Sequence, residues 1–195
     1  MNRINATAPA ERNKQPIFAR LAPLLHRADH VLEIGAGNGA HARHALACLA
    51  QVHWQATEHP ARMAELTQAL AAQPRLPAPV ALDVTGAWPE GPFAAVYAAN
   101  VAHIMAWPAV AAMVAGSARV LAPGGLLCLY GPFFDAQQAT APSNLEFDQL
   151  LRSRDPAMGL RSLQAVHELA ADNGFDLCHD WAMPANNRLL VWALA

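Results

Sequence analysis

The chain has 195 residues, of which 54% are hydrophobic and only 14% are charged, with a formal net charge of −2. This length suits one domain with a substantial core, and the near-zero charge gives no reason to expect nucleic acid or an anionic membrane as the main partner. Apolar runs stay below the roughly 20 residues of a membrane span, positions 1–20 lack an apolar signal-peptide core, and the cysteines show no C-x-x-C pair, so we expect one cytoplasmic domain.

The first pattern along the chain is a charged cluster followed by a helix. Apolar residues recur at helical spacing after the cluster, namely Ile17, Phe18, Leu21, Leu24 and Leu25. Asn13 is expected to cap this helix, with Pro16 in its first turn. Glu11, Arg12 and Lys14 precede it, and either a disordered tail or a lid over a polar ligand would account for so much charge in one place.

Strand and helix patterns then alternate. Strands are expected at 30–35, 52–58, 79–84, 93–100 and 126–133, and helices at 38–50, 61–72 and 107–121. This order predicts an α/β fold with a parallel sheet and helices on both faces.

The end of the chain breaks this alternation. After a helix at 162–174, two strand patterns at 175–184 and 186–195 are joined by only a few residues, so they must pair antiparallel. The predicted sheet is therefore mostly parallel with a reversed last strand. Residues 134–161 are long for a plain connection, which makes them a candidate insert beside an acceptor site.

The stretch "VLEIGAGNGAH" places Gly35, Gly37 and Gly39 between a buried strand and a helix. Glycines there allow a sharp turn and close approach of a ligand, and the helix N-terminus suits an anionic group. The string also fits G-x-G-x-x-A, so the glycines alone do not separate a dinucleotide from another nucleoside cofactor.

Acidic residues after the strands sharpen this prediction. Glu58 follows the second strand about 20 positions after the glycines, where a carboxylate grips ribose hydroxyls. Asp83 follows the third strand, within reach of an adenine amino group, although such a residue can also be a helix cap. Glu33 completes E-x-G-x-G-x-G, which resembles the first motif of class I S-adenosylmethionine-dependent methyltransferases, as does the terminal antiparallel hairpin.

Longer motifs carry a narrower resemblance. The stretches "ERNKQPI", "LEIGAGNGAHA", "LAPGGLLCLYGPF" and "SNLEFDQLLRSRDPAMGLRSL" are similar to a small family of methyltransferase-like proteins from bacteria and animals, catalogued as a domain of unknown function. The match covers nearly the whole chain. It implies a seven-stranded methyltransferase sheet, S-adenosylmethionine as cofactor and S-adenosylhomocysteine as product, and it implies no substrate. Glu58 is a departure, because the family more usually has Asp there.

The methyl acceptor is expected beyond the carboxyl ends of the strands. Asn100 and His103 follow the fourth strand and would face the methyl group, with Tyr130 lining the acceptor pocket. His103 is either a general base or a pocket-wall residue bonded to the backbone. The N/D-P-P-Y/F string of amino-group methyltransferases is missing, which lowers the expectation of a nucleic-acid or protein nitrogen acceptor.

These observations predict a methyltransferase that acts on an unidentified small molecule, as a monomer or homodimer. The expected cofactor-binding residues are Glu33, Gly35, Gly37, Gly39, His41, Glu58, Asp83 and Asn100. In the fold that the resemblance implies, residues 1–29 form a lid segment and helix. The expected lid and substrate residues are Arg12, Asn13, Lys14, Asn144, Arg152, Arg154 and Arg161, although arginines can equally tie the insert to the sheet.

Other interpretations remain open. An NAD(P)-dependent oxidoreductase would share the glycine loop, and a non-catalytic module could bind S-adenosylmethionine without turnover. His41, His44 and Cys48 share one helix face, but no fourth ligand accompanies them, so no metal is expected.

Overall fold

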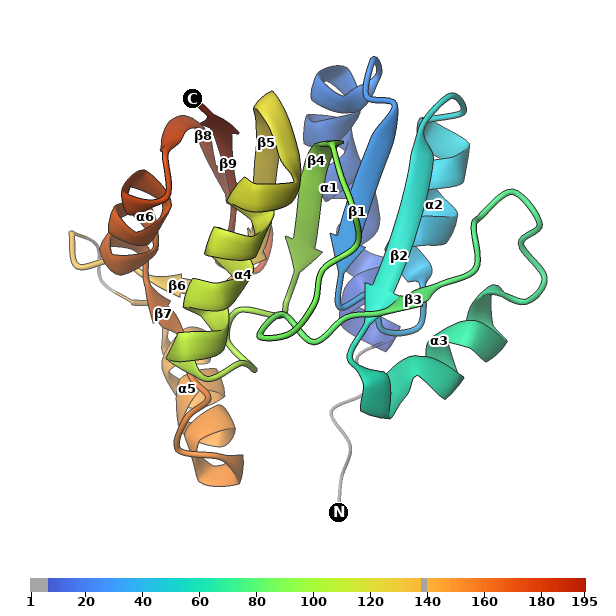
Figure 1. The fold of residues 1–195 in the computed structure, drawn as a ribbon. Helices are drawn as coiled ribbons and strands as arrows, with labels where there is room; N and C mark the ends of the chain where they lie inside the picture. The colour runs from blue at the N-terminus through green and yellow to red at the C-terminus, as the bar shows by residue number, and fades with distance from the viewer. Residues whose placement is uncertain (1–6, 138–139) are drawn as a thin grey trace.

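The computed structural model of the chain describes residues 7–137 and 140–195. Its core is a seven-stranded sheet in the order β3-β2-β1-β4-β5-β9-β8 (Figure 1). The strands are β1 (His30–Ile34), β2 (His53–Glu58), β3 (Val80–Ala81), β4 (Phe93–Ala99), β5 (Leu121–Gly131), β8 (Phe175–Met183) and β9 (Asn187–Leu194). Among the described strands of this sheet, β9 alone runs opposite to the rest, so it pairs antiparallel with both β5 and β8. The predicted fold class is therefore confirmed.

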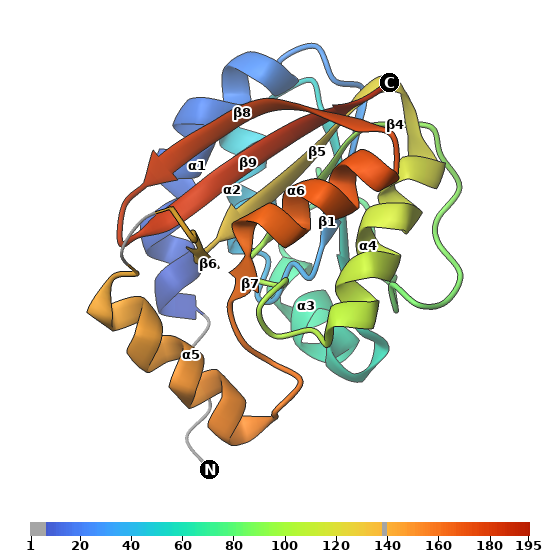
Figure 2. The ribbon, with the colours of Figure 1, turned by 90° about the vertical axis from the view of Figure 1, so that its left-hand side faces the viewer.

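Helices cover both faces of the sheet. They are α1 (Thr7–Leu25), α2 (Ala40–Cys48), the 3-10 turn η1 (Pro60–Arg62), α3 (Met63–Leu70), α4 (Trp107–Val120), α5 (Pro142–Arg154) and α6 (Leu163–Asp172). Figure 2 shows α1 and α2 on one side of the strands and α4 and α6 on the other. None of the helices in the described part of the chain is long and apolar enough to cross a membrane.

The side chains of β4 show how the strand sequence supports both layers. Ala95 and Tyr97 belong to the core beneath α1 and α2, while Val96 and Ala98 belong to the core beneath α4 and α6. Successive residues of a strand point to opposite faces, so an uninterrupted apolar run is buried on both sides.

The sheet reverses direction of winding between β1 and β4. The chain enters at β1, builds β2 and β3 on one side, and then crosses to β4 and β5 on the other. The carboxyl ends of these parallel strands share one edge, which is the lower edge in Figure 1. Ligands of open α/β sheets bind at such a switch point.

Helix α1 begins earlier than predicted. It starts at Thr7, so Asn13 lies inside the helix and the expected Asn13 cap is wrong. Pro16 also lies inside it, although proline removes a helical hydrogen bond and crowds the preceding turn. The predicted cap depended on local preference, whereas the buried side chains of Ile17, Phe18 and Leu21 fix the helix by packing against the sheet.

The proposed insert contains a helix that was not predicted. Within residues 134–161, α5 spans Pro142–Arg154, and a parallel pair of short strands, β6 (Phe133–Phe134) and β7 (Arg161–Ser162), joins the two ends of the insert. Two strand boundaries also differ from prediction. β5 begins at Leu121 rather than at 126, and the third strand is reduced to Val80–Ala81.

Candidate functional site

The glycine loop connects β1 to α2. Gly37 has φ +60°, a left-handed conformation that favours glycine, and a Cβ placed on it would meet nothing within 4 Å. Gly35 has φ +67°, and there a Cβ would lie 2.5 Å from Cγ1 of Val101. Gly37 therefore leaves open space for a ligand, while Gly35 allows close packing of the loop.

A cavity of about 470 Å³ lies over this loop, and we call it the loop cavity. Its polar lining comes from the carboxyl ends of β1 to β4 and the segments after them: Glu33, Asn38, His41, Glu58, His59, Arg62, Asp83, Thr85 and Asn100. Gly35 and Gly37 add backbone of the glycine loop. Apolar side chains complete it, among them Leu82, Val84, Val101, Ile104 and Met105. The volume and the mixture of apolar walls with converging polar groups suit a small-molecule ligand.

Glu58 ends β2 and is only 4% exposed. Its Oε2 accepts a hydrogen bond from the Gly37 N–H at 2.8 Å, and its Oε1 accepts one from the His59 N–H at 2.8 Å. A carboxylate has about four acceptor positions, so both oxygens can accept further bonds. The carboxylate thus holds the glycine loop and still offers acceptor capacity to a ligand.

Asp83 is exposed and forms a local turn. Its Oδ1 accepts hydrogen bonds from the Thr85 hydroxyl at 2.7 Å and the Thr85 N–H at 2.9 Å. The bond from the Thr85 hydroxyl is the main reason that the pKa of Asp83 is lowered. Asp83 therefore has the turn-forming role that its residue type favours, and it also lines the loop cavity.

Glu33 is a buried carboxyl at the floor of the loop cavity. Its Oε2 accepts a hydrogen bond from the Trp54 indole N–H at 2.6 Å. Burial raises the pKa of Glu33 from 4.5 to about 7, the Trp54 bond lowers it, and the nearby Glu58 raises it further. The proton on Glu33 is thus held weakly near neutral pH.

A second and larger cavity, of about 1370 Å³, adjoins the first, and we call it the outer cavity. Its walls come from α1, α3, α5, the β4 and β5 ends and the β8–β9 turn: Arg12, Asn13, Arg62, Glu65, Gln68, His103, Tyr130, Ser143, Asn144, Phe147, Pro184 and Asn187 are among them. Asn38, Arg62, Asn100 and Ile104 line both cavities. Ligands bound in the two cavities would therefore contact each other beside these residues.

Asn100 is the first residue after β4 and has φ +61°. Its N–H donates to the Tyr130 carbonyl at 2.8 Å, which holds it between β4 and β5. A left-handed residue other than glycine costs free energy, and asparagine tolerates this conformation better than most. The fold thus keeps a strained polar residue at the junction of the two cavities.

His103 lies in the wall of the outer cavity and is 6% exposed. Burial, assisted by the nearby charge of Arg161, lowers the pKa of His103 from 6.5 to about 4, so the ring is neutral at pH 7. Its ring packs edge-to-face with Phe147, with centroids 5.2 Å apart. Among the described residues, no hydrogen-bond partner accompanies its ring nitrogens.

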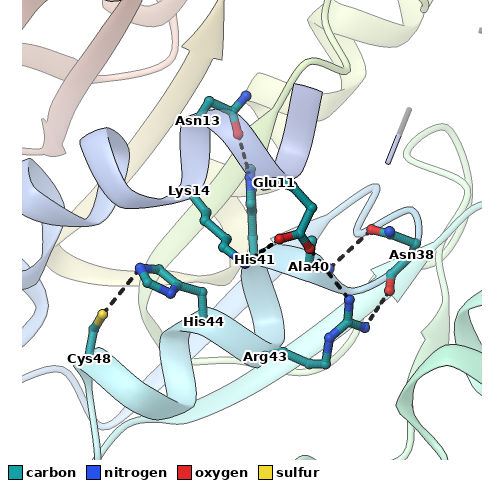
Figure 3. A network of polar contacts seen from close by, with 9 residues as sticks. All are labelled: Glu11, Asn13, Lys14, Asn38, Ala40, His41, Arg43, His44 and Cys48. Carbon is teal, nitrogen blue, oxygen red and sulfur yellow. Dashed lines mark hydrogen bonds and ion pairs between the residues drawn. The ribbon is translucent and has the colours of Figure 1, made fainter. Parts of the chain in front are cut away.

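The first half of α1 is attached to α2 by polar contacts (Figure 3). His41 Nε2 lies 2.8 Å from Asn13 Oδ1, and Nδ1 lies 2.8 Å from the Tyr97 hydroxyl. Because the amide oxygen only accepts, Nε2 carries the proton and the Tyr97 hydroxyl donates to Nδ1. Burial lowers the pKa of His41 to about 4, so this arrangement is uncharged.

Residues 4–194 match the family described as "Protein of unknown function (DUF938)". This chain belongs to that family. The family description assigns no activity, so the function of this DUF938 chain depends on its site.

Solved structures of methyltransferases share the fold. An O-methyltransferase family protein from Burkholderia thailandensis is 14% identical with a TM-score of 0.77, covering 98% of this chain and 61% of its own. Human N-acetylserotonin methyltransferase in complex with SAM is 16% identical with a TM-score of 0.79, covering 94% of this chain and 52% of its own. PigF with SAH is 17% identical with a TM-score of 0.78, covering 97% and 65%. The DUF938 chain thus spans only part of the length of these proteins, and at such identities the likeness concerns the fold.

The two cavities bring together many of the residues predicted for the site. The loop cavity gathers all the predicted cofactor residues except Gly39, and the outer cavity gathers Arg12, Asn13, Asn100, His103, Tyr130 and Asn144. A Cβ on Gly39 would lie 2.4 Å from Cδ2 of Leu70, so this glycine serves the packing of α3. Lys14 forms an ion pair with Glu11 and lines neither cavity.

Arginines of the insert make structural contacts in the DUF938 chain. Arg161 donates from Nε to the Ala102 carbonyl at 3.0 Å and from Nη2 to the Met105 and Ala157 carbonyls. Arg152 donates to Asp148 at 2.8 Å. Neither these two nor Arg154 is among the described residues that line the cavities. Arg161 ties the insert to the segment after β4, which is the alternative that the sequence left open, while the Arg152–Asp148 pair lies within α5 itself.

Several lining residues were not predicted. Arg62, Phe147 and Asn187 line the outer cavity, and the β8–β9 turn approaches it from the far edge of the sheet. Arg62 gave no local signal, because it lies on η1 beyond the end of β2, and only the turn between them brings its guanidinium 3.9 Å from the Glu58 carboxylate. The sequence does not single out the β8–β9 turn, because its residues are expected there for backbone reasons alone. Ala185 and Asn186 do have positive φ, but the turn also lies at the outer cavity.

Proposed function

We propose that this chain is an S-adenosylmethionine-dependent methyltransferase acting on a small molecule. The observation that carries the proposal is the pair of cavities that meet at Asn100, one over the glycine loop and one bounded by α1, α5 and the β8–β9 turn. A cofactor cavity joined to an acceptor cavity is what group transfer between two bound molecules requires. Neither alternative, oxidoreductase or idle module, gains support from the structural matches.

The residues of the loop cavity fit the proposed cofactor. The open space above Gly37 admits a ligand against the backbone, and Glu33, Gly35 and His41 would surround the methionine part. Glu58 has acceptor capacity for two ribose hydroxyls, and Asp83 would receive the adenine amino group. Apolar side chains beside Asp83, such as Leu82, Val84 and Met105, suit a flat ring. When bound, S-adenosylmethionine supplies a methyl group on a positively charged sulfonium.

His103 and Tyr130 would bound the acceptor, together with Asn144 of α5. Most of the acceleration of an in-line transfer can come from alignment, and these residues would fix the acceptor in place. His103 is uncharged at neutral pH, and its lowered pKa of about 4 makes it a weak base, so it would act mainly by orienting the acceptor.

Calorimetric titration with S-adenosylmethionine and S-adenosylhomocysteine tests this function. We expect saturable binding of both with Kd below about 100 µM, and none of NADH. A folded sample that binds neither nucleoside at about 1 mM would refute the proposal. Binding of NADH instead would favour the oxidoreductase alternative, and binding of S-adenosylmethionine without turnover of any acceptor would favour the idle module.

We further propose that the first half of α1 acts as a lid, since Ala10 lines the loop cavity while Arg12 and Asn13 line the outer cavity. Deletion of residues 1–14 should weaken binding of S-adenosylhomocysteine roughly tenfold, because it removes one wall of each cavity. Thermal unfolding should still show a cooperative transition, since Ile17, Phe18 and Leu21 keep their places in the core. Unchanged affinity for S-adenosylhomocysteine would refute the lid and favour the interpretation of this segment as a tail.

A further inference from the structure

The outer cavity has an uncommitted positive charge. Its charged lining residues are Arg12, Arg62 and Glu65. The guanidinium of Arg62 lies 3.9 Å from the Glu58 carboxylate and 3.8 Å from that of Glu65, so this cation already faces two anions. Arg12 has no ion-pair or hydrogen-bond partner among the residues that the structure describes.

Other cations near α1 are engaged in structural contacts. Lys14 pairs with Glu11, and Arg43 donates to the Asn38 carbonyl at 2.7 Å while lying 3.9 Å from Glu11 (Figure 3). Arg20, also on α1, lies over the ring of Trp181 at 5.6 Å. Arg12 differs from these three cations because it lines a cavity. Charged residues make up only 14% of the chain, so a cation at a cavity without a partner among the described residues is notable.

The wall formed by the β4 end and α5 holds a polar ring that has no hydrogen bond to a described residue. His103 is buried to all but 6%, lines the cavity, and has no ring hydrogen bond within the described part of the chain. Its ring nitrogens are therefore free to hydrogen-bond a ligand in the cavity or water. The His103–Phe147 pair, with Tyr130 and Pro132, offers the flat apolar contact that a ring prefers.

We propose that the methyl acceptor is a small organic anion, with a carboxylate or phosphate held by Arg12 and a flat apolar body against His103 and Phe147. This inference rests on the proposed methyltransferase function. A cationic acceptor would meet Arg12 and the cofactor's sulfonium, and the cavity's own acid, Glu65, already lies beside Arg62. The Arg12 side chain is exposed and can reach a ligand in the cavity. A carboxylate or phosphate matches its planar fork of donors, whereas a neutral acceptor gains no charge-assisted hydrogen bond from it.

Ligand titration of the chain saturated with S-adenosylhomocysteine tests the inference. The probes are benzoate, phenyl phosphate and neutral benzamide, which share a ring and differ in charge. We expect at least one anion to bind about tenfold more tightly than benzamide, and Arg12→Gln to remove most of that preference. Arg20→Gln is the matched control, because it removes a cation from the same helix outside both cavities, and it should keep the preference.

The outcomes separate this inference from the function on which it rests. Absence of S-adenosylhomocysteine binding would refute the methyltransferase proposal itself. With that ligand bound, equal binding of benzoate and benzamide, binding of neither anion, or a preference that survives Arg12→Gln would overturn the assignment of an anionic acceptor. Tighter binding of phenyl phosphate than of benzoate would identify the anionic group as a phosphate, and the reverse order as a carboxylate.

Discussion

The Glu58→Ala variant should bind S-adenosylhomocysteine at least about 100-fold more weakly than the unmodified chain. The substitution removes the acceptor for the Gly37 and His59 N–H groups and the proposed acceptor for two ribose hydroxyls. Hydrogen bonds to a charged group contribute about 1.5–3 kcal/mol each, so loss of two from the ligand alone reaches this magnitude. Isothermal titration calorimetry measures the change directly.

Two further variants show whether the carboxylate itself is responsible. Glu58→Gln keeps the shape but has one acceptor oxygen, so its affinity should lie between those of the other two proteins. Glu65→Ala removes the other acid beside Arg62. Because Glu65 lines only the outer cavity, the affinity of this variant for S-adenosylhomocysteine should stay within about threefold of the unmodified chain. A folded Glu58→Ala protein with unchanged affinity would contradict the ribose assignment.

The parts of the site that the sequence predicted come from local rules. The glycine loop needs backbone conformations that favour glycine, and the residue that ends a parallel strand must lie at the carboxyl edge of the sheet. Gly37, Glu58 and Asn100 follow from these rules without knowledge of any tertiary contact. The apolar strands were equally predictable, because β4 is buried on both faces and reads as an uninterrupted apolar run.

The parts that were missed depend on contacts between distant segments. Helix α5 buries Asn144, Asp148 and Leu151, so its inward face is mostly polar and a search for apolar periodicity finds little. Asp148 is satisfied by the Leu160 N–H at 2.8 Å, on the far side of the insert. The N-terminus of α1 was misplaced for the same reason, since Asn13 is needed by His41, 28 positions later in the chain.

Substitution of Glu33 should change how stability depends on pH. The folded chain holds the Glu33 proton up to about pH 7, whereas the unfolded chain releases it near 4.5, because burial penalises the charged form. Between these values the folded state binds more protons. The stabilisation from Glu33 is therefore fully present below pH 4.5 and is lost as the pH rises through about 7, a total of about 3 kcal/mol.

The comparison of wild type with Glu33→Gln isolates this contribution. Glutamine does not titrate and can still accept from the Trp54 indole, so the free energy of unfolding of the wild type relative to the variant should fall by about 3 kcal/mol between pH 4.5 and 8. His41 and His103, whose pKa values are lowered to about 4, act in the opposite direction, losing stabilisation as the pH falls from 6.5. They are present in both proteins and cancel in the difference.

Urea unfolding followed by tryptophan fluorescence at several pH values measures this difference. Glu65→Gln is the control, because it makes the same substitution at an exposed carboxyl, and the pH dependence of the Glu33→Gln difference is compared with its own. A Glu33→Gln difference that does not vary with pH would show that burial does not raise the pKa of Glu33 above its ordinary value. Added S-adenosylmethionine should lower the pKa of Glu33, if its ammonium lies beside this carboxyl, and reduce the pH dependence of the wild type. The same titration would therefore tie the buried acid to the proposed cofactor.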